Sequence, residues 1–291
     1  MKFPVILSVL LAASSLRAGD EVKCRSRVTF QPSKLSVNMP FQRSHNGVFV
    51  PVHVNGKAET LWFLFDSGSG HTLISDAAAK RLLIHPGEKT TIRSRTGLMT
   101  VTESKSASIG IDTIDIDHVD LHTANLAGLT PAWGRAVDGI LGYDLLCRSA
   151  VTIDYAASSI TITQPAVFKY EGTGDTLPLA IRNGWAFVRG TIKVTGRPPV
   201  IDNFLIDSGS QDAVNHPIIR DSKGPLRTVK AGVIGSNEWF QLGRYTLGST
   251  QSSCCAPTEE TSRQIGSEVL SRFRVTLDYP HKRLILEQRT R

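Results

Sequence analysis

Short apolar stretches separated by turn residues make up most of this chain, and this pattern predicts strands more often than helices. Between Val48 and Val54, apolar and polar residues alternate as in a half-buried strand, and Asn55-Gly56 is a typical hairpin turn. The apolar run from Leu61 to Phe65 then returns beside the first strand. The pattern therefore predicts a hairpin that leads directly into Asp66.

The same pattern predicts only short helices. Ser75 is a plausible N-cap for a helix that continues to Leu83, and residues 142–147 can form a helical turn. Residues 89–122 alternate with β-branched residues and glycines, which indicates several strands. A further hairpin is expected from Val151–Tyr155 and Ile160–Thr163, with Asp154 on a polar face or beside the turn, and Asp278 placed equivalently.

One heptapeptide occurs in two nearly identical copies. Residues 63–69 read FLFDSGS and residues 204–210 read FLIDSGS, at an offset of 141. A single Asp-Ser-Gly is a common turn signal, because Asp caps its own backbone and Gly accommodates positive φ. Placing a carboxylate at the end of an apolar strand costs desolvation free energy, which needs compensation by hydrogen bonds or function. The repetition therefore indicates two buried carboxylates, Asp66 and Asp207, with a shared purpose.

The repetition extends beyond this motif, so the chain is an internal duplication. Seven residues of the first half recur at a constant offset of 124: Gly142, Leu146, Arg148, Val151, Thr152, Asp154 and Tyr155 match Gly266, Leu270, Arg272, Val275, Thr276, Asp278 and Tyr279. We predict a first lobe at 19–165, a linker at 166–174 that is rich in turn residues, and a second lobe at 175–291. The length agrees with two domains.

These motifs resemble the aspartic peptidases of the pepsin and retropepsin type, in which each lobe or subunit supplies one Asp-Thr/Ser-Gly loop. That family also has an apolar-apolar-Gly segment in each lobe. Ile140-Leu141-Gly142 matches it, whereas Gln264-Ile265-Gly266 departs from it at Gln264. The first lobe resembles the bacterial secreted, two-lobed, retropepsin-like members most closely. The resemblance implies an all-β fold with short helices, built as two duplicated barrel-like lobes with the active site between them.

The resemblance also implies roles for the residues of both loops. Asp66 and Asp207 would be the catalytic pair, and Ser67 and Ser208 would hold the loops together across the lobes. Gly68 and Gly209 would allow their close approach, and Ser69 and Ser210 would hydrogen-bond the carboxylates. A flap, the hairpin that closes over substrate, is expected around Thr96, Gly97 and Leu98, although an ordinary turn fits these residues too. Residues 232–239 are a possible second flap.

The N-terminus has the pattern of a secretory signal peptide over residues 1–18, because Lys2 precedes an apolar run from Phe3 to Ala13 and small residues follow. This run is too short to span a bilayer. A short buried helix is the alternative interpretation. The pattern predicts a secreted or periplasmic protein, and it leaves open whether residues 19–45 form a removable pro-segment.

The net charge and the cysteines further limit the classes of protein to which this chain can belong. The formal charge is +7, and removing residues 1–18 with Lys2 and Arg17 leaves +5, without the aromatic interleaving typical of nucleic-acid binding. No metal or cofactor is predicted, since His71 and His216 each stand alone and are expected at the surface or in a wall of the cleft. The four cysteines, Cys24, Cys147, Cys254 and Cys255, allow three pairings, among which the sequence does not decide.

We therefore expect a monomeric secreted aspartic endopeptidase that acts on peptides or proteins, with no membrane span. The alternative is a catalytically silent two-lobed module that binds peptides or resembles an inhibitor. Degenerate members would be expected to lose one Asp or one Gly, and both loops are intact here. The sequence contains neither a Gly-x-Ser-x-Gly nor a His-Glu-x-x-His motif, either of which would indicate another class of hydrolase. The sequence does not define a substrate preference.

Overall fold

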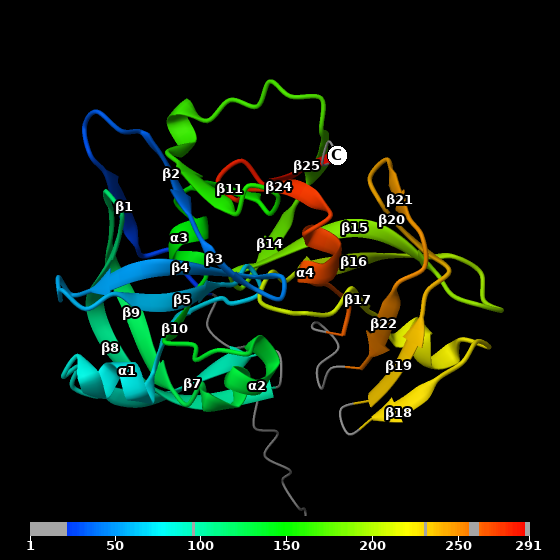
Figure 1. Ribbon diagram of the computed structural model, residues 1–291, viewed down its shortest axis with the longest axis horizontal. Helices are drawn as coiled ribbons and strands as arrows, with labels where there is room; N and C mark the ends of the chain where they lie inside the picture. Colours follow the sequence, from blue (N-terminus) through cyan, green and yellow to red (C-terminus); the bar gives the residue numbers. More distant parts are fainter. Residues whose placement is uncertain (1–21, 95–96, 230–231, 256–261, 289–291) are drawn as a thin grey trace, which may run out of the picture.

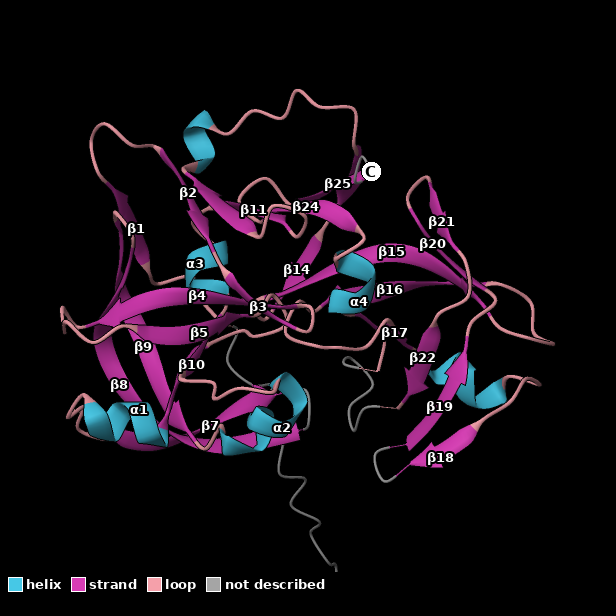
Figure 2. Cartoon of the chain, viewed as in Figure 1, coloured by secondary structure: helices cyan, strands magenta, loops and turns pink. Residues whose placement is uncertain are grey.

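The structure is a computed structural model that describes residues 22–94, 97–229, 232–255 and 262–288. Within these residues the chain is mainly β and its strands form three sheets, as Figures 1 and 2 show. The predicted all-β class with short helices is confirmed. The predicted signal peptide, residues 1–18, lies outside the described residues, and the predicted lobe boundaries stay predictions.

The first sheet has nine strands from the first half of the chain. They are β1 (Arg27–Phe30), β3 (Gln42–Ser44), β4 (Gly47–Val54), β5 (Leu61–Phe65), β6 (Thr72–Ser75), β7 (Glu88–Ser94), β8 (Gly97–Ile111), β9 (Ile114–Ala124) and β10 (Gly139–Leu141). Their order is β1-β9-β6-β10-β5-β4-β8-β7, with β3 paired to β4. The hairpin β4–β5 is antiparallel and β5 runs parallel to β10, so Asp66 follows a strand that is paired on both sides.

The second sheet repeats this arrangement with ten strands of the second half. They are β14 (Ala180–Arg182), β15 (Trp185–Lys193), β16 (Val200–Ile206), β17 (Val214–Asn215), β18 (Arg227–Val229), β19 (Gly232–Ser236), β20 (Trp239–Leu242), β21 (Tyr245–Leu247), β22 (Gln251–Cys254) and β23 (Gln264–Ile265). Here β15–β16 is the antiparallel hairpin and β16 is parallel to β23. Asp207 therefore follows a strand that is paired on both sides, as Asp66 does.

The third sheet joins the two halves of the chain. Its six strands are β2 (Ser36–Pro40), β11 (Ala150–Asp154), β12 (Ser159–Thr163), β13 (Asp175–Pro178), β24 (Phe273–Asp278) and β25 (Arg283–Gln288), in the order β13-β25-β24-β11-β12-β2. At its centre β11 pairs with β24, which is its own counterpart in the duplication. Thr152 lies opposite Thr276, and their hydroxyls are 2.8 Å apart. These two residues mark the axis that relates the halves.

Helices are short, as the sequence predicts. They are α1 (Asp76–Arg81), α2 (Thr130–Trp133), α3 (Tyr143–Leu146) and α4 (Ser267–Leu270), with the 3-10 helices η1 (Ala127–Leu129), η2 (Pro165–Val167) and η3 (Pro217–Asp221). The predicted cap of α1 is confirmed, because the Ala78 N–H donates to Ser75 Oγ at 3.1 Å. The α3 turn and the β11–β12 hairpin also form where the sequence predicts them.

The burial of some strands differs from the simple alternation in the sequence. β4 was expected to be half buried, but all of its side chains except Pro51 and His53 are buried. The reason is that a large apolar cluster containing Val48 and Val50 covers one face, while a second cluster around Phe49 and Trp133 covers the other. A strand between two apolar layers needs no polar face.

Asp154 and Asp278, which are equivalent in the duplication, have different environments. Asp154 accepts hydrogen bonds from the N–H groups of Ala156 and Ala157, each at 2.9 Å, so it lies beside its turn as predicted. Asp278 was expected to lie equivalently, but its side chain is fully buried and accepts from Arg283 Nε at 2.7 Å. Asp278 nevertheless also lies beside its turn, as predicted, because it accepts from the His281 N–H at 3.3 Å. Its burial was not predicted, and the Arg283 cation supplied by β25 allows it.

The segment after the predicted signal peptide is integrated into the fold. β1 pairs with β9 in the first sheet, and β2 pairs with β12 in the third. Cys24 is disulfide-bonded to Cys147, with their Cα atoms 6.0 Å apart, and the Ser26 hydroxyl donates to the Asp144 carbonyl at 2.6 Å. Residues 24–44 thus contribute strands to two sheets, and their removal would take away one pairing partner each from β9 and β12.

The remaining cysteines and the surface charges complete the description. Cys254 and Cys255 are joined to each other, which is one of the arrangements that the sequence leaves open.

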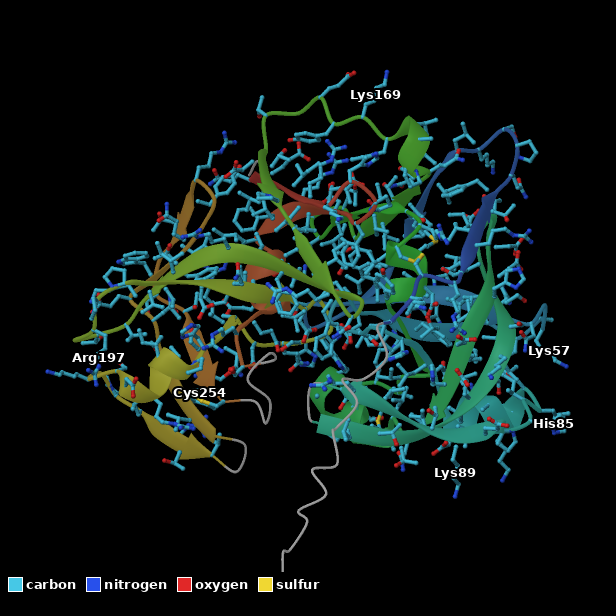
Figure 3. The ribbon with its side chains drawn as sticks, turned by 180° about the vertical axis from the view of Figure 1, so that it is seen from behind. Lys57, His85, Lys89, Lys169, Arg197 and Cys254 are labelled. Atoms are coloured by element: carbon cyan, nitrogen blue, oxygen red, sulfur yellow. A yellow bond between two sulfur atoms is a disulfide. The ribbon has the colours of Figure 1, made fainter. Side chains whose placement is uncertain are left out.

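In Figure 3 the exposed basic residues Lys57, Lys89, Lys169 and Arg197 project from separate parts of the molecule, so the positive charge is spread out. No helix in the described part of the chain has the length and apolar character needed to cross a membrane.

Candidate active site

The first Asp loop is held by backbone hydrogen bonds on both sides of Asp66. The Asp66 N–H donates to the Leu141 carbonyl at 2.9 Å, which continues the pairing of β5 with β10. The Ser69 N–H donates to the Asp66 carbonyl at 3.2 Å and closes the turn. The Gly68 N–H donates to Asp66 Oδ1 at 2.8 Å and so fixes the direction of the carboxylate.

The second loop repeats these backbone bonds. The Asp207 N–H donates to the Ile265 carbonyl at 3.0 Å, and the Ser210 N–H donates to the Asp207 carbonyl at 3.3 Å. Asp207 is only 5% exposed, whereas Asp66 is partly exposed. The duplicated sequence motif is therefore a duplicated structure.

Ser67 and Ser208 bind the two loops to each other in a reciprocal way. The Ser67 N–H donates to Ser208 Oγ, and the Ser208 N–H donates to Ser67 Oγ, both at 3.0 Å. The Ser67 hydroxyl donates to the Ile206 carbonyl at 2.8 Å, and the Ser208 hydroxyl donates to the Phe65 carbonyl at 3.0 Å. All four bonds are buried, so the two loops have one fixed relative position.

The glycines of the loops allow the carboxylates to approach each other. A side-chain carbon at Gly68 would overlap the carboxylate of Asp207, and one at Gly209 would overlap the carboxylate of Asp66. Each carboxylate thus lies against the glycine of the opposite loop. This crossed arrangement brings Asp66 and Asp207 together from positions 141 residues apart in the sequence.

Comparisons with known proteins agree with this geometry. Residues 50–145 match the family model described as aspartyl protease. The structure is similar to that of an aspartic proteinase from Irpex lacteus, with a TM-score of 0.55 at 12% sequence identity, over 88% of this chain and 98% of that one. The chain has the aspartic protease fold. No curated protein matches it closely enough to count as a relative. The predicted resemblance to pepsin- and retropepsin-type peptidases is thus confirmed.

Beneath the loops, the aspartic protease fold is supported by the two glycines after the apolar pairs. A side-chain carbon at Gly142 would overlap the Ser69 carbonyl, and one at Gly266 would overlap the carbonyl of Asp212. Gln264, the departure from the family pattern, is fully buried, and no described residue hydrogen-bonds its side-chain amide. β23 nevertheless keeps its pairing with β16, so the departure changes the polarity below Asp207 without disturbing the backbone.

Tyr279 is a site residue that the sequence indicates only as part of the repeat. Its hydroxyl donates to the Ser67 carbonyl at 3.1 Å inside the protein. Burial raises the pKa of Tyr279 above its usual range, and the neighbouring Asp66, Tyr143 and Asp207 raise it further. The phenol therefore remains a neutral donor that supports the first loop from the second lobe.

Ser69 and Ser210 do not take the role expected from the resemblance. The Ser69 hydroxyl donates to the His71 carbonyl at 2.7 Å, which uses its single proton within the turn. Ser210 Oγ accepts from the Asp212 N–H at 3.3 Å. Both hydroxyls thus stabilise the backbone that follows the loop, and the expectation that they hydrogen-bond the carboxylates is corrected for this structure.

The predicted flap region is part of a hairpin. β7 and β8 pair antiparallel up to Ser94 and Gly97, and Leu98 is 75% exposed, while Thr96 lies outside the described residues. Ile92 of this hairpin packs in the same cluster as Trp133 of α2, and the neighbouring Ala132 carbonyl accepts a hydrogen bond from Gln211, which follows the second Asp loop. The hairpin is thus connected to the site through α2. Residues 232–236, in the possible second flap, form β19, which pairs with β18.

The two histidines near the loops are not exposed side chains. His71 stacks edge-on against His122, with ring centroids 4.8 Å apart, and burial followed by the neighbouring His122 lowers the pKa of His71 to about 4. His216 is 4% exposed and its Nδ1 accepts from the Ile218 N–H at 3.0 Å, so it caps η3. Within the described residues, no three His, Cys, Asp or Glu side chains are grouped so that they could hold a metal ion.

Proposed function

We propose that this chain is a secreted aspartic endopeptidase that hydrolyses peptide bonds with a water molecule activated by Asp66 and Asp207. The family match and the fold support a peptidase. The observation that carries the catalytic assignment is the crossed packing of the two loops, in which each carboxylate lies against the glycine of the other loop. The predicted signal peptide supports secretion or export to the periplasm.

The mechanism follows from two carboxylates that each lie against the glycine of the opposite loop. Aspartic peptidases are a known example of such a pair, in which like charges cannot both ionise and one proton is shared. The ionised carboxylate accepts a proton from the water, whose oxygen bonds to the peptide carbonyl carbon. The protonated carboxyl donates its proton to the carbonyl oxygen. When the tetrahedral intermediate collapses and the C–N bond breaks, the carboxyl that took the proton from water gives it to the amine nitrogen. The other carboxylate takes a proton back from a hydroxyl of the intermediate, which restores the pair with one shared proton.

The fixed loop geometry is what such a reaction needs. Ser67 and Ser208 hold the loops in one register, so neither carboxylate must be ordered at the moment of reaction. A catalytically silent module would tolerate the loss of an Asp or a loop Gly, and both loops retain all three residues. The intact loops therefore favour the enzyme over the silent module.

The proposal is tested by incubating the purified mature chain with a mixed peptide library and identifying new termini by mass spectrometry. A peptide with a secondary alcohol in place of the scissile carbonyl, as in statine, should inhibit cleavage because it resembles the tetrahedral intermediate. Metal chelators and serine-reactive reagents should have no effect. Absence of any cleavage, or complete inhibition by a chelator, would overturn the proposal.

A further inference from the structure

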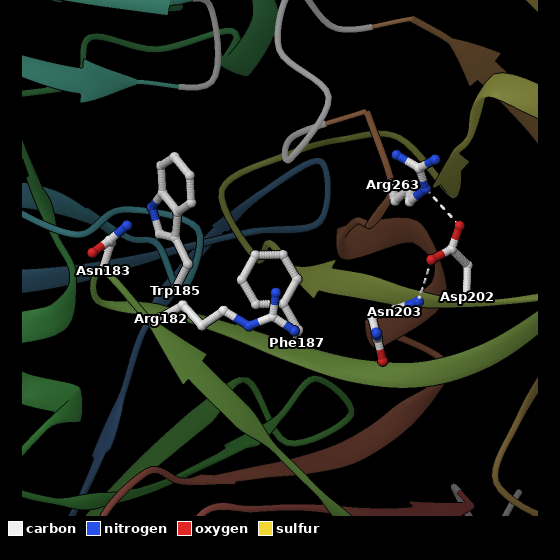
Figure 4. A pocket seen from close by; sticks show the side chains of 7 residues that line it. All are labelled: Arg182, Asn183, Trp185, Phe187, Asp202, Asn203 and Arg263. Atoms are coloured by element: carbon white, nitrogen blue, oxygen red, sulfur yellow. Dashed lines mark hydrogen bonds and ion pairs between the residues drawn. The ribbon is translucent and has the colours of Figure 1, made fainter. Parts of the chain in front are cut away.

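A cavity of about 360 Å³ lies beside β16, the strand that leads into the second Asp loop. Its walls come from the β14–β15 turn, from β16 and from Arg263, as Figure 4 shows. The aromatic rings of Trp185 and Phe187 contribute to it, and Arg182, Asp202 and Asn203 are further lining residues. The pocket thus combines aromatic surface with charged and amide groups.

The strand register places this pocket on the same sheet face as Asp207. Phe187 lies opposite Leu205, which precedes Asp207 by two residues and so points to the same side of β16. Trp185, Phe187 and Leu205 form a small apolar cluster of their own, whereas the alternate residues Phe204 and Ile206 face the large core. The pocket also reaches the first lobe, because a side-chain carbon at Gly70 would touch the Asn183 carbonyl at 2.9 Å.

The residues that line the pocket carry one more positive charge than negative charge. Arg263 Nε donates to Asp202 Oδ2 at 2.5 Å. Burial raises the pKa of Asp202, but the Asn203 N–H, Arg263 and His216 together lower it below its usual value, so this carboxylate is ionised and compensates Arg263. Arg182 is exposed, and none of the described carboxylates forms an ion pair with it.

Arg182 is nevertheless held in a defined place. Its guanidinium carbon lies 5.2 Å from the centroid of the Phe187 ring, in a cation–π arrangement. In Figure 4 the Arg182 side chain extends across this ring towards the pocket. A guanidinium that stacks on an aromatic face keeps its N–H donors at its edge, where they can bind a carboxylate.

The corresponding place in the first lobe is closed. Phe49 is the counterpart of Phe187, since it lies opposite Leu64, two residues before Asp66. Trp133 packs edge-on against Phe49 with centroids 6.0 Å apart, and Arg135 lies 4.5 Å above the same ring while donating to Gln42 Oε1 at 2.6 Å. Arg135 of the first lobe is thus already engaged with protein groups, whereas among the described residues the corresponding place in the second lobe is an open pocket beside Arg182.

We propose that Arg182 is a specificity-determining residue, and that the pocket selects peptide substrates with a glutamate side chain on the second-lobe side of the scissile bond. The proposal rests on the proposed peptidase function. The aromatic rings of Trp185 and Phe187 accommodate the methylene groups of the glutamate, and the guanidinium of Arg182 binds its carboxylate. Aspartate is shorter by one methylene, so it reaches Arg182 less well.

Matched peptides test this assignment. In a cleavable peptide, each position around the scissile bond is occupied in turn by Glu or Gln, and kcat/KM is measured near pH 6.5, where glutamate is ionised. At one position on the second-lobe side, we expect Glu to be preferred over Gln by about fivefold, the size of a solvent-accessible charge-assisted bond. Arg182→Gln should bring this ratio to about one, and Arg182→Glu should instead favour Lys at that position. Arg220→Gln removes an exposed cation of η3 outside the pocket and should leave the ratio unchanged.

The outcomes separate this inference from the proposed function. Equal kcat/KM for Glu and Gln at every position, or a Glu preference that survives in Arg182→Gln, would overturn the role of Arg182 while leaving the peptidase intact. If the chain cleaves none of the peptides, the proposed function fails. In that case, calorimetry measures the dissociation constants of the Glu and Gln peptides with the wild-type chain and with Arg182→Gln. A fivefold difference that depends on Arg182 would support the inference about the pocket. Equal dissociation constants would overturn it.

Discussion

Ser67 and Ser208 are the residues on which the geometry of the site depends most directly. Replacing Ser208 by Ala would leave the Ser67 N–H and the Phe65 carbonyl without their buried partner. A buried group that loses its partner costs about 1–3 kcal/mol. We therefore expect Ser208→Ala to lower the free energy of unfolding by at least this amount in a urea titration. Ser33→Ala, at an exposed turn, is the control, and equal midpoints for both variants would contradict the account.

His71 makes the stability of the first lobe depend on pH. Its pKa is about 4 in the folded chain against an ordinary value of 6.5. Between these values the unfolded chain binds a proton that the folded chain does not, so stability falls as the pH falls from about 6.5 to about 4. Asp144 acts oppositely, because burial raises its pKa to about 6 from 3.8, so the folded chain binds the additional proton in that range.

The two residues can be separated by variants. His71→Asn should reduce the loss of unfolding free energy between pH 6.5 and pH 4, and Asp144→Asn should increase it. Chemical unfolding at pH 6.5, 5.5 and 4 measures both slopes. Because the comparison concerns slopes, a constant packing defect in either variant does not affect it. Parallel stability curves for both variants and the wild type would show that neither group controls the pH dependence.

Single residues also show what the sequence could predict. The pairing of Asp66 with Asp207 and of Ser67 with Ser208 follows from the repeated motif and the resemblance, and the geometry agrees with it. The hydroxyl direction of Ser69 could not be predicted, because it depends on where the His71 carbonyl lies after the turn. The role of Tyr279 could not be predicted either, because it reaches Ser67 over 212 residues of sequence.

Among the elements, the β7–β8 hairpin is the one whose function can be tested most directly. Leu98 is exposed at its end, so it contributes little to the core. If the hairpin closes over substrate, Leu98→Ser should lower kcat/KM for peptides several-fold, because an apolar contact of about 1–2 kcal/mol is lost. The urea midpoint should not change. Leu83→Ser, which is 77% exposed beyond α1, is the matched control and should leave both quantities unchanged. A normal kcat/KM in Leu98→Ser would favour the ordinary turn.

Element positions were predicted better than element environments. The hairpins, the cap of α1 and the α3 turn depend on local signals such as Asn-Gly and Ser, and they form at the expected residues. The double-sided burial of β4 depends on Trp133 and other residues distant in sequence, so a local alternation could not reveal it. The same holds for Asp278, whose burial depends on Arg283 of the next strand.

At the scale of the whole molecule, the third sheet couples the two halves through Thr152 and Thr276. Their hydroxyls are buried and 2.8 Å apart. Thr152→Val or Thr276→Val alone should destabilise the chain by about 1–3 kcal/mol, because the remaining hydroxyl loses its partner. The double variant should be less destabilised than the sum, since both polar groups are gone. Urea unfolding of the four proteins gives the coupling free energy. Strict additivity would show that this contact does not link the halves.

The duplication predicted the two-lobed plan, but it could not predict how the N-terminal segment is used. β1 belongs to the first sheet, whereas β2 crosses to the third sheet and pairs with β12. Such long-range pairings depend on the assembled lobes rather than on local sequence signals. The disulfide between Cys24 and Cys147 also joins residues whose pairing the sequence left open.

The central claim is that Asp66 and Asp207 act together in peptide hydrolysis, and it is tested most directly by kcat/KM of the single Asp→Asn variants on one cleaved peptide. We expect kcat/KM to fall by about 10² to 10⁴-fold in Asp66→Asn and in Asp207→Asn, which is the typical contribution of a positioned acid or base. The circular dichroism spectrum should not change. Asp112→Asn, an exposed carboxylate at a turn, should retain full activity. Unchanged hydrolysis in either Asp66→Asn or Asp207→Asn would contradict the account.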